Sequence, residues 1–98
     1  MPTFETTPAF VTDLHRLTPS QRERFRRTVL DSFVTDLRTH NGFRPGLRIK
    51  TVRSTIGVWE LTWAPNGRAT WSYGPQKLCG VPHVVWRRIG THAILTRP

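Results

Sequence analysis

Hydrophobic and polar positions in residues 1–17 predict a short strand followed by a short helix. Residues 3–7 alternate in polarity and carry β-favouring side chains, which is typical of a strand. Thr7 followed by Pro8 predicts a helix start, because a capping residue then precedes proline at the first helical position. Four apolar residues then share one helical face: Phe10, Val11, Leu14 and Leu17.

A second, longer helix is predicted over residues 19–41. Thr18 and Gln21 have the spacing of a capping box at its start. Apolar residues recur every four positions and predict a buried stripe made of Phe25, Val29, Phe33 and Leu37. Arginines occupy the remaining surface, and Asn41 followed by Gly42 predicts the end of the helix. The two helices should form a hairpin, since only a tight turn separates them.

From residue 47 onward the period changes to two, which predicts strands. We expect them over residues 47–53, 58–63, 68–73 and 83–89. Between them we expect a turn at 54–57, a hairpin turn at Asn66 and Gly67, and a loop at 74–82. Residues 90–98 are expected to form a short tail.

This order of elements predicts an α+β domain that spans residues 1–98. It would contain an N-terminal strand, a two-helix hairpin and a four-stranded antiparallel sheet, with the helices on one sheet face. The tryptophans of the sheet are expected to pack under the helices rather than to stack on bases: Trp59, Trp63, Trp71 and Trp86. The opposite face would be free for a ligand, and the N-terminal strand would have to pair within the same sheet.

The charge of the chain indicates a polyanionic partner. Fifteen Lys and Arg residues face six Asp and Glu residues, which gives a formal charge of +9. Only Lys50 and Lys77 are lysines, and arginine suits forked contacts with phosphate. Nucleic acid is therefore the first candidate partner, and a membrane surface or an acidic protein are the alternatives.

Metal and membrane chemistry find no support in the sequence. Cys79 is the only cysteine, so no internal disulfide can form, and no Cys or His stands at metal-ligand spacing from it. The N-terminus lacks a signal-peptide pattern, and no apolar run is long enough to cross a bilayer. We therefore expect a cytoplasmic protein with no metal, no cofactor and no membrane partner.

Three segments together resemble the RelE/ParE toxin superfamily. Residues 43–50 (FRPGLRIK) are similar to the basic strand that follows the helical hairpin in that family. Residues 58–63 (VWELTW) are similar to its central strand, and residues 86–92 (WRRIGTH) to its last strand. The resemblance covers nearly the whole chain and depends on the order and spacing of the segments.

The resemblance implies a RelE-like fold and the toxin of a type II toxin–antitoxin system. RelE-type members are metal-independent endoribonucleases that cut mRNA on the ribosome and inhibit translation, and a cognate antitoxin neutralises each of them. The partners implied are therefore an antitoxin protein, the ribosome and mRNA. Two alternatives stay open: a non-enzymatic inhibitor of DNA gyrase, as in the ParE branch, and an inactive relative that only binds RNA.

The chain departs from the family pattern at three places. Glu60 stands where many RelE toxins have Arg on the central strand, and His92 stands where others have Arg. The C-terminal Tyr of several members has no counterpart in residues 95–98. The site would therefore rely on a carboxylate and an imidazole as well as on cations.

His92 and Glu60 are the candidate groups for proton transfer. RNA cleavage through the 2′-hydroxyl needs a base, an acid and cations for the charge that builds on the phosphate. Histidine is the side chain that ordinarily titrates near neutral pH, so His92 is the first candidate acid or base, unless it is only a solvated tail residue. Glu60 could act as the base, orient a partner, or simply form a cross-strand ion pair with Arg48 or Lys50.

The cations divide into catalytic and binding candidates. Arg48 and Lys50 are expected to share the sheet face of Glu60 and to stabilise phosphate charge. Arg87 and Arg88 should point to opposite faces, and Arg87 is preferred as the catalytic one. The predicted RNA-binding residues are Arg44, Arg48, Lys50, Arg53 and Arg88. The remaining histidines are expected on the surface or in loops: His15, His40 and His83.

Overall fold

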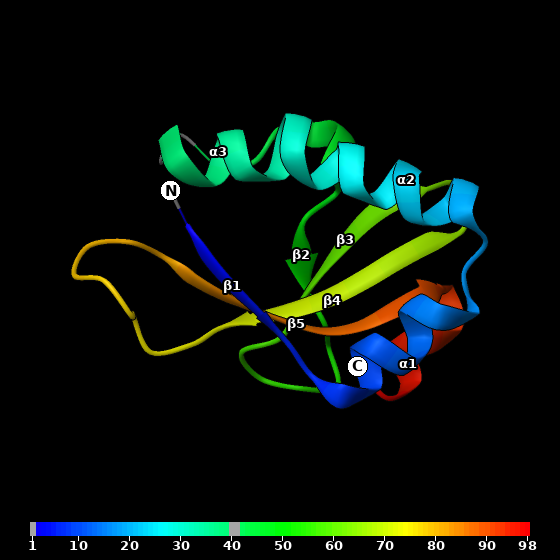
Figure 1. The fold of residues 1–98 in the computed structure, drawn as a ribbon. Coiled ribbons are helices and arrows are strands. Elements are labelled where there is room, and N and C mark those ends of the chain that lie inside the picture. Colours follow the sequence, from blue (N-terminus) through cyan, green and yellow to red (C-terminus); the bar gives the residue numbers. More distant parts are fainter. Residues whose placement is uncertain (1, 40–41) are drawn as a thin grey trace.

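A computed structural model of the chain describes residues 2–39 and 42–98 and confirms the α+β class (Figure 1). The elements are β1 (Thr3–Thr6), α1 (Pro8–Arg16), α2 (Pro19–Thr28), the π-helical segment η1 (Val29–Phe33), α3 (Val34–Thr39), the 3₁₀ turn η2 (Pro45–Leu47), β2 (Lys50–Thr51), β3 (Trp59–Ala64), β4 (Gly67–Tyr73), β5 (His83–Thr91) and the 3₁₀ helix η3 (His92–Thr96).

The strands form one sheet in the order β1-β5-β4-β3-β2. Neighbouring strands are antiparallel except β1, which runs parallel to β5. The Thr3 amide donates to the Pro82 carbonyl at 3.0 Å, and the Thr7 amide donates to the Trp86 carbonyl at 3.0 Å. The N-terminal strand therefore pairs within the same sheet, as predicted.

Both predicted helix starts are present. The Thr7 hydroxyl accepts the Phe10 amide at 3.1 Å, and Pro8 follows at the first helical position. Thr18 and Gln21 form a complete capping box, in which each side chain accepts the other residue's backbone amide. These contacts satisfy amide groups that no helical carbonyl can reach.

The long helix runs from α2 through η1 into α3 without a break, and its centre is π-helical. A stripe repeating every four residues drifts by about 40° per step around an α-helix, because the helix has 3.6 residues per turn. The wider π turn holds more residues and offsets part of this drift. Phe33 and Leu37 therefore stay buried against the sheet. The predicted end at Asn41, and His40 before it, lie outside the described residues.

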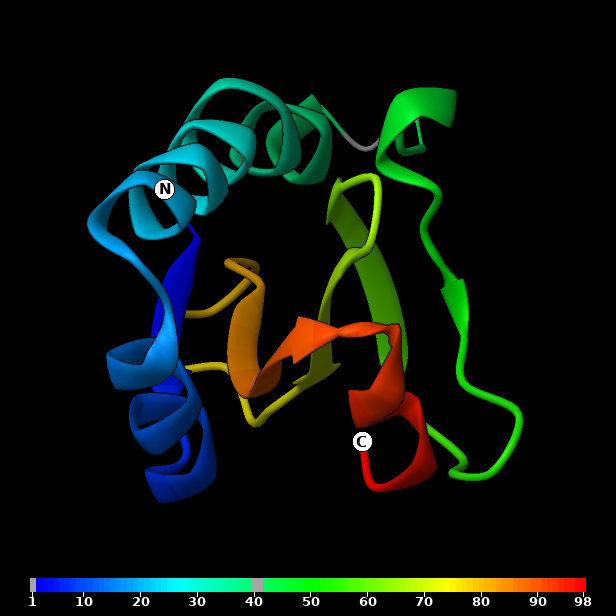
Figure 2. The same cartoon turned by 90° about the vertical axis from the view of Figure 1, so that its right-hand side faces the viewer.

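Aromatic rings join the long helix to the sheet. Phe25 meets Trp63 and Trp86 at centroid distances of 6.2 and 5.3 Å. Phe33 meets Trp71 and Trp86 at 5.1 and 5.2 Å. Figure 2 shows the long helix above the sheet and the C-terminal turn on its lower side. The helices thus cover the tryptophan face, as predicted, although Trp59 is only half-buried beside Trp71.

The strand predicted over residues 47–53 is largely wrong. Only Lys50 and Thr51 pair with β3. Pro45 opens the 3₁₀ turn η2, and Arg48 after it has φ 49°. This left-handed conformation cannot continue a strand and is costly for a residue with a Cβ. The predicted alternation, with Leu47 and Ile49 on one face and Arg48 and Lys50 on the other, is therefore interrupted at Arg48.

The predicted tail is ordered. β5 extends to Thr91, beyond the expected end at residue 89, and η3 follows directly. The Thr91 hydroxyl accepts the Ala93 amide at 3.3 Å, and Ile94 is buried. The residues after β5 are thus held against the sheet.

An ion pair connects α3 to the start of η2. Arg44 donates from Nε and Nη2 to the two carboxylate oxygens of Asp36, each at 2.9 Å, and its amide donates to Oδ2 at 2.9 Å. The side-chain hydrogen bond from Arg44, together with its backbone bond, lowers the pKa of Asp36, and Asp36 raises the pKa of Arg44.

Within residues 2–39 and 42–98, no helix has the length and apolar character needed to cross a membrane. In the same described ranges, no three His, Cys, Asp or Glu side chains are placed to hold a metal ion.

Phe33→Ala should lower the free energy of unfolding by about 3–5 kcal/mol, because it removes a fully buried ring and leaves a cavity. Leu30→Ala is the control on the same helix, since Leu30 is 47% exposed, and it should change stability by about 0.5 kcal/mol or less. Urea unfolding followed by circular dichroism measures both. Equal losses of unfolding free energy in the two variants would contradict the assignment of Phe33 to the buried face of the helix.

Asp36→Asn should flatten the loss of stability at acid pH. A carboxylate whose pKa is lowered by folding contributes stability above its ordinary pKa of 3.8, and that contribution disappears as pH falls through the folded value. The free energy of unfolding should therefore fall more steeply for the wild type than for the variant between about pH 5 and pH 2. Asp31→Asn, an exposed carboxylate of the same helix, should leave the slope closer to that of the wild type.

Candidate functional site

A polar row crosses the sheet face opposite the long helix. Lys50 lies opposite Glu60, Glu60 opposite Thr70, and Thr70 opposite Arg88 in the strand registers. Leu61 belongs to the core under the helices, and successive side chains of a strand point to opposite faces. The face that the sequence left free for a ligand therefore carries one carboxylate, one hydroxyl and two cations.

The Glu60 hollow lies at one end of this row. Its volume is about 360 Å³, and it is lined by Lys50, Thr51, Val52, Arg53, Ser54, Glu60 and Leu95. The Glu60 side chain is only 5% exposed, and Lys50 Nζ lies 3.7 Å from its Oε1. The fold thus brings together three of the predicted site residues, namely Glu60, Lys50 and Arg53. The predicted alternative for Glu60, a cross-strand ion pair, is present as well.

His92 begins η3 and is exposed to solvent. Leu95, which lines the Glu60 hollow, follows it by three residues. Side chains three positions apart eclipse each other in a 3₁₀ helix. His92 therefore shares one side of η3 with Leu95 and lies one turn before it.

Two predicted basic residues lie away from the Glu60 hollow. Arg48 is not among its lining residues, and its left-handed backbone places it before β2 begins. The expectation that Arg48 shares the face of Lys50 and Glu60 is therefore wrong. Arg44 is exposed, but its guanidinium donates hydrogen bonds to both carboxylate oxygens of Asp36.

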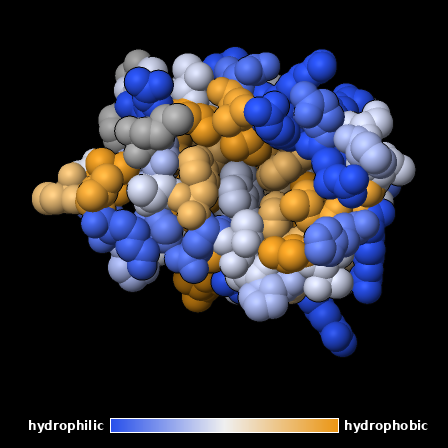
Figure 3. Space-filling model, in the orientation of Figure 1, coloured by the Kyte–Doolittle hydropathy of each residue, from blue (hydrophilic) through white to orange (hydrophobic). Residues whose placement is uncertain are grey.

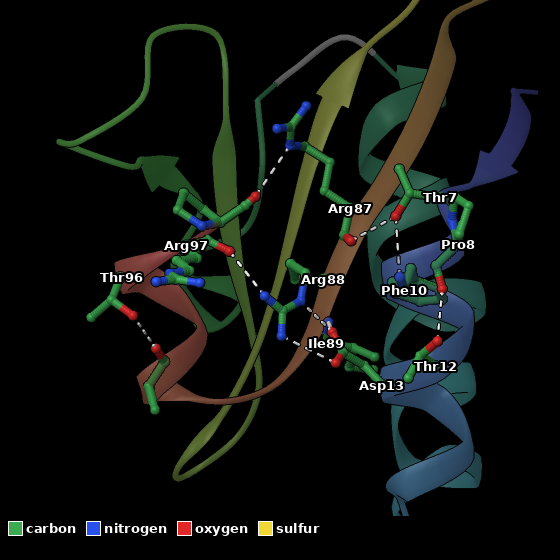
Figure 4. A network of polar contacts seen from close by, with 12 residues as sticks. Thr7, Pro8, Phe10, Thr12, Asp13, Arg87, Arg88, Ile89, Thr96 and Arg97 are labelled. Atoms are coloured by element: carbon green, nitrogen blue, oxygen red, sulfur yellow. Dashed lines mark hydrogen bonds and ion pairs between the residues drawn. The ribbon is translucent and has the colours of Figure 1, made fainter.

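The expectation that Arg87 and Arg88 point to opposite faces is also wrong. Trp71 pairs with Trp86, whereas Thr70 pairs with Arg88, so Arg87 is an extra residue in a β-bulge. Both arginines then reach the same C-terminal segment (Figure 4). Arg87 Nε donates to the Pro98 carbonyl at 3.3 Å, and Arg88 Nη1 donates to the Arg97 carbonyl at 3.1 Å.

Asp13 is a buried partner that sequence analysis missed. It accepts from Arg88 Nε at 2.5 Å and Nη2 at 3.1 Å, and from the Ile89 amide at 3.2 Å. The hydrogen bond from Arg88 to Asp13 raises the pKa of the guanidinium. A signal was available, because Asp13 stands three residues after Phe10 on the apolar face of α1. An acid in that position indicates a buried partner.

Thr70 is the second residue that was missed. It is fully buried between Glu60 and Arg88 in the register, and its Oγ1 has no hydrogen-bond partner in the described part of the chain. The sequence shows only a polar residue between Ala69 and Trp71. Its burial depends on elements far away along the chain and leaves no local signal.

His83 is buried rather than on the surface, so that expectation is wrong. Its Nδ1 lies 2.7 Å from the Thr3 hydroxyl and its Nε2 lies 2.6 Å from Glu5 Oε1. The contact with His83 lowers the pKa of Glu5, mainly through the hydrogen bond. This cluster joins β1 to β5 and contains none of the predicted site residues.

The Glu60 hollow can support acid–base chemistry on a phosphate ester. It offers a nearly buried carboxylate, a lysine beside it and an arginine on its wall, with an exposed imidazole one turn from its rim. A base, an acid and cations are the groups that transesterification at phosphorus requires.

Comparison with known proteins gives matches only among solved structures: no family model and no curated protein matches the sequence. YafQ from E. coli strain BL21(DE3) is 14% identical, with a TM-score of 0.62, over 97% of this chain and 98% of that chain. A YoeB/ParE toxin from Agrobacterium tumefaciens is 12% identical, with a TM-score of 0.65, over 92% of this chain and 98% of that chain.

A chain of the RelBE2 toxin–antitoxin complex from Mycobacterium tuberculosis is 20% identical, with a TM-score of 0.62. The match covers 94% of this chain and 100% of that chain. At identities this low, the matches show a shared arrangement of helices and strands and do not show shared chemistry. The chain therefore has the RelE-like toxin fold that its sequence motifs predict.

Proposed function

We propose that the protein is the toxin of a type II toxin–antitoxin system, and that it inhibits translation by cutting mRNA at the ribosome without a metal ion. The observation that carries the proposal is the Glu60 hollow, in which a carboxylate and two cations gather on the sheet face opposite the helices. The RelE-like fold, its similarity to toxins and the charge of +9 support the same conclusion.

The reaction assigns one role to each group. Glu60 takes the proton of the ribose 2′-hydroxyl, and the oxygen attacks the adjacent phosphorus. The new O2′–P bond forms as the P–O5′ bond breaks, which gives a cyclic phosphate and a 5′-hydroxyl. His92 donates the proton that the departing 5′-oxygen needs.

Cations stabilise the negative charge that builds on the phosphate oxygens. Lys50 already balances Glu60 at 3.7 Å, and Arg53 lies on the wall of the same hollow. Arg87 is a further candidate, because a single contact of 3.3 Å to a carbonyl holds its Nε. Arg88 fits the role poorly, since Asp13 neutralises it.

A cognate antitoxin is the partner protein that we propose. The structures similar to this chain include the DinJ–YafQ and RelBE2 complexes, in which a toxin is bound to its antitoxin. A short gene beside the gene for this chain, whose product binds the chain tightly and relieves growth arrest, would identify the antitoxin.

His92→Gln should lower mRNA cleavage by about 100- to 10,000-fold, because glutamine keeps the polarity but cannot exchange a proton. Glu60→Gln should cost as much if the carboxylate is the base. Cleavage is measured by mapping mRNA 5′ ends in a translation extract supplied with purified ribosomes. Arg38→Gln, an exposed cation of α3, is the control and should cut as the wild type does.

Thermal unfolding of each variant separates lost chemistry from lost folding. Full cleavage by both His92→Gln and Glu60→Gln would remove these residues from the mechanism. Growth arrest without any mRNA cleavage, accompanied by loss of DNA supercoiling activity, would replace the proposal with gyrase inhibition.

A further inference from the structure

Three adjoining hollows meet at Arg24 on the helix side of the sheet. Their volumes are about 320, 470 and 430 Å³, and Arg24 is the residue that lines all three. One wall is the helix surface with Ser20, Arg24, Thr28 and Ser32, and the other is the β3–β4 hairpin. Trp63 and Ala64 line two of the hollows. We call this continuous surface the Arg24 groove.

The Arg24 groove is positively charged. Arg24 is exposed and forms no ion pair within residues 2–39 and 42–98, whereas the nearby Glu23 is shared by Arg26 and Arg27. Arg27 is a second exposed cation that lines the groove, and Glu23 is the carboxylate that lines the same hollow. Figure 3 shows strongly hydrophilic residues gathered over α2.

A further cation, Arg68, binds the β3–β4 turn, although it is not among the described residues that line the three hollows. Arg68 Nη1 donates to the Gly67 carbonyl at 3.0 Å and to the Ala64 and Pro65 carbonyls at 3.4 Å. These acceptors are neutral, so the turn that lines the groove keeps the full positive charge of the guanidinium.

Hydroxyl groups follow the groove along its length. On the helix wall they belong to Ser20, Thr28 and Ser32. The Thr28 hydroxyl donates to the Arg24 carbonyl at 3.0 Å and keeps its lone pairs for a further donor. The ribose 2′-hydroxyl is such a donor, and it is the group that distinguishes RNA from DNA.

The groove and the Glu60 hollow lie on opposite faces of the sheet. Trp63 packs against Phe25 of the long helix, whereas Glu60 belongs to the opposite alternation of the same strand. No residue of the Glu60 hollow lines any of the three hollows at Arg24 in the described part of the chain.

We propose that the Arg24 groove is a docking surface for an RNA backbone, separate from the face that holds the Glu60 hollow. Arg24 and Arg27 contact phosphate oxygens, and the groove hydroxyls contact ribose. A protein that binds RNA on both faces can grip a structured RNA with one face while the other takes a single strand. This inference goes beyond the proposed cleavage activity, because it needs no chemistry at Glu60.

The test compares two charge-matched double variants of the full chain. Arg24→Gln with Arg27→Gln removes two cations that line the groove. Arg26→Gln with Arg38→Gln removes two exposed cations of the same long helix that line none of the hollows. Binding of a fluorescent 12-nucleotide RNA is followed by anisotropy at several salt concentrations, and a denaturing gel checks that the probe is intact.

The groove variant should bind RNA about tenfold more weakly near 0.1 M salt, and its salt slope should fall by about 0.7 for each lost phosphate contact. The matched control should keep the wild-type slope to within about half of that change. Wild-type protein should bind the DNA version of the probe more weakly than RNA. Equal effects of the two double variants, or equal wild-type affinity for RNA and DNA, would overturn the proposal.

Two further arms separate the competing explanations. If the groove variant loses affinity for a polyglutamate peptide but not for RNA, the surface is for an acidic protein and the proposal is wrong. If no protein cleaves mRNA but the groove variant still binds RNA more weakly than its control, the result counts against the proposed function alone. If cleavage is normal and the two double variants bind RNA equally, the result counts against this inference alone.

Discussion

Phe25 and Phe33 reach from the long helix onto Trp63, Trp71 and Trp86, and this contact fixes which side of each strand is buried. Side chains of a strand alternate, so the same packing sends Glu60 and Thr70 to the opposite face. A slip of one residue in β3 or β4 would bury the polar row under the helices. The candidate site is therefore a consequence of the aromatic core.

The bulge at Arg87 interrupts that alternation and determines how the C-terminus is held. Without the extra residue, Arg87 and Arg88 would point away from each other. With it, both donate to carbonyls of residues 97 and 98, and Asp13 holds Arg88 from α1. η3 is thereby kept against β4 and β5, and Leu95 closes one side of the Glu60 hollow. The hollow depends on long-range polar contacts as well as on the sheet.

Local signals were enough to predict most elements, and long-range contacts were not. The Thr7–Pro8 start and the Thr18–Gln21 box depend on neighbours within three residues, and both predictions are confirmed. The left-handed turn at Arg48 has no marker such as glycine, so the alternating pattern around it predicted too long a strand. His83 meets partners 78 and 80 residues away, which periodicity cannot reveal.

The net charge of this protein does not show where RNA would bind, because carboxylates form ion pairs with several of the basic residues. Asp36 holds Arg44, Asp13 holds Arg88 and Glu60 lies beside Lys50, so three of the five predicted RNA-binding residues have an acidic partner. An excess of +9 with only six acids therefore leaves its unbalanced positive charge elsewhere, on exposed residues such as Arg24 and Arg48. Where acids are few, the positions they occupy decide which basic residues can meet phosphate.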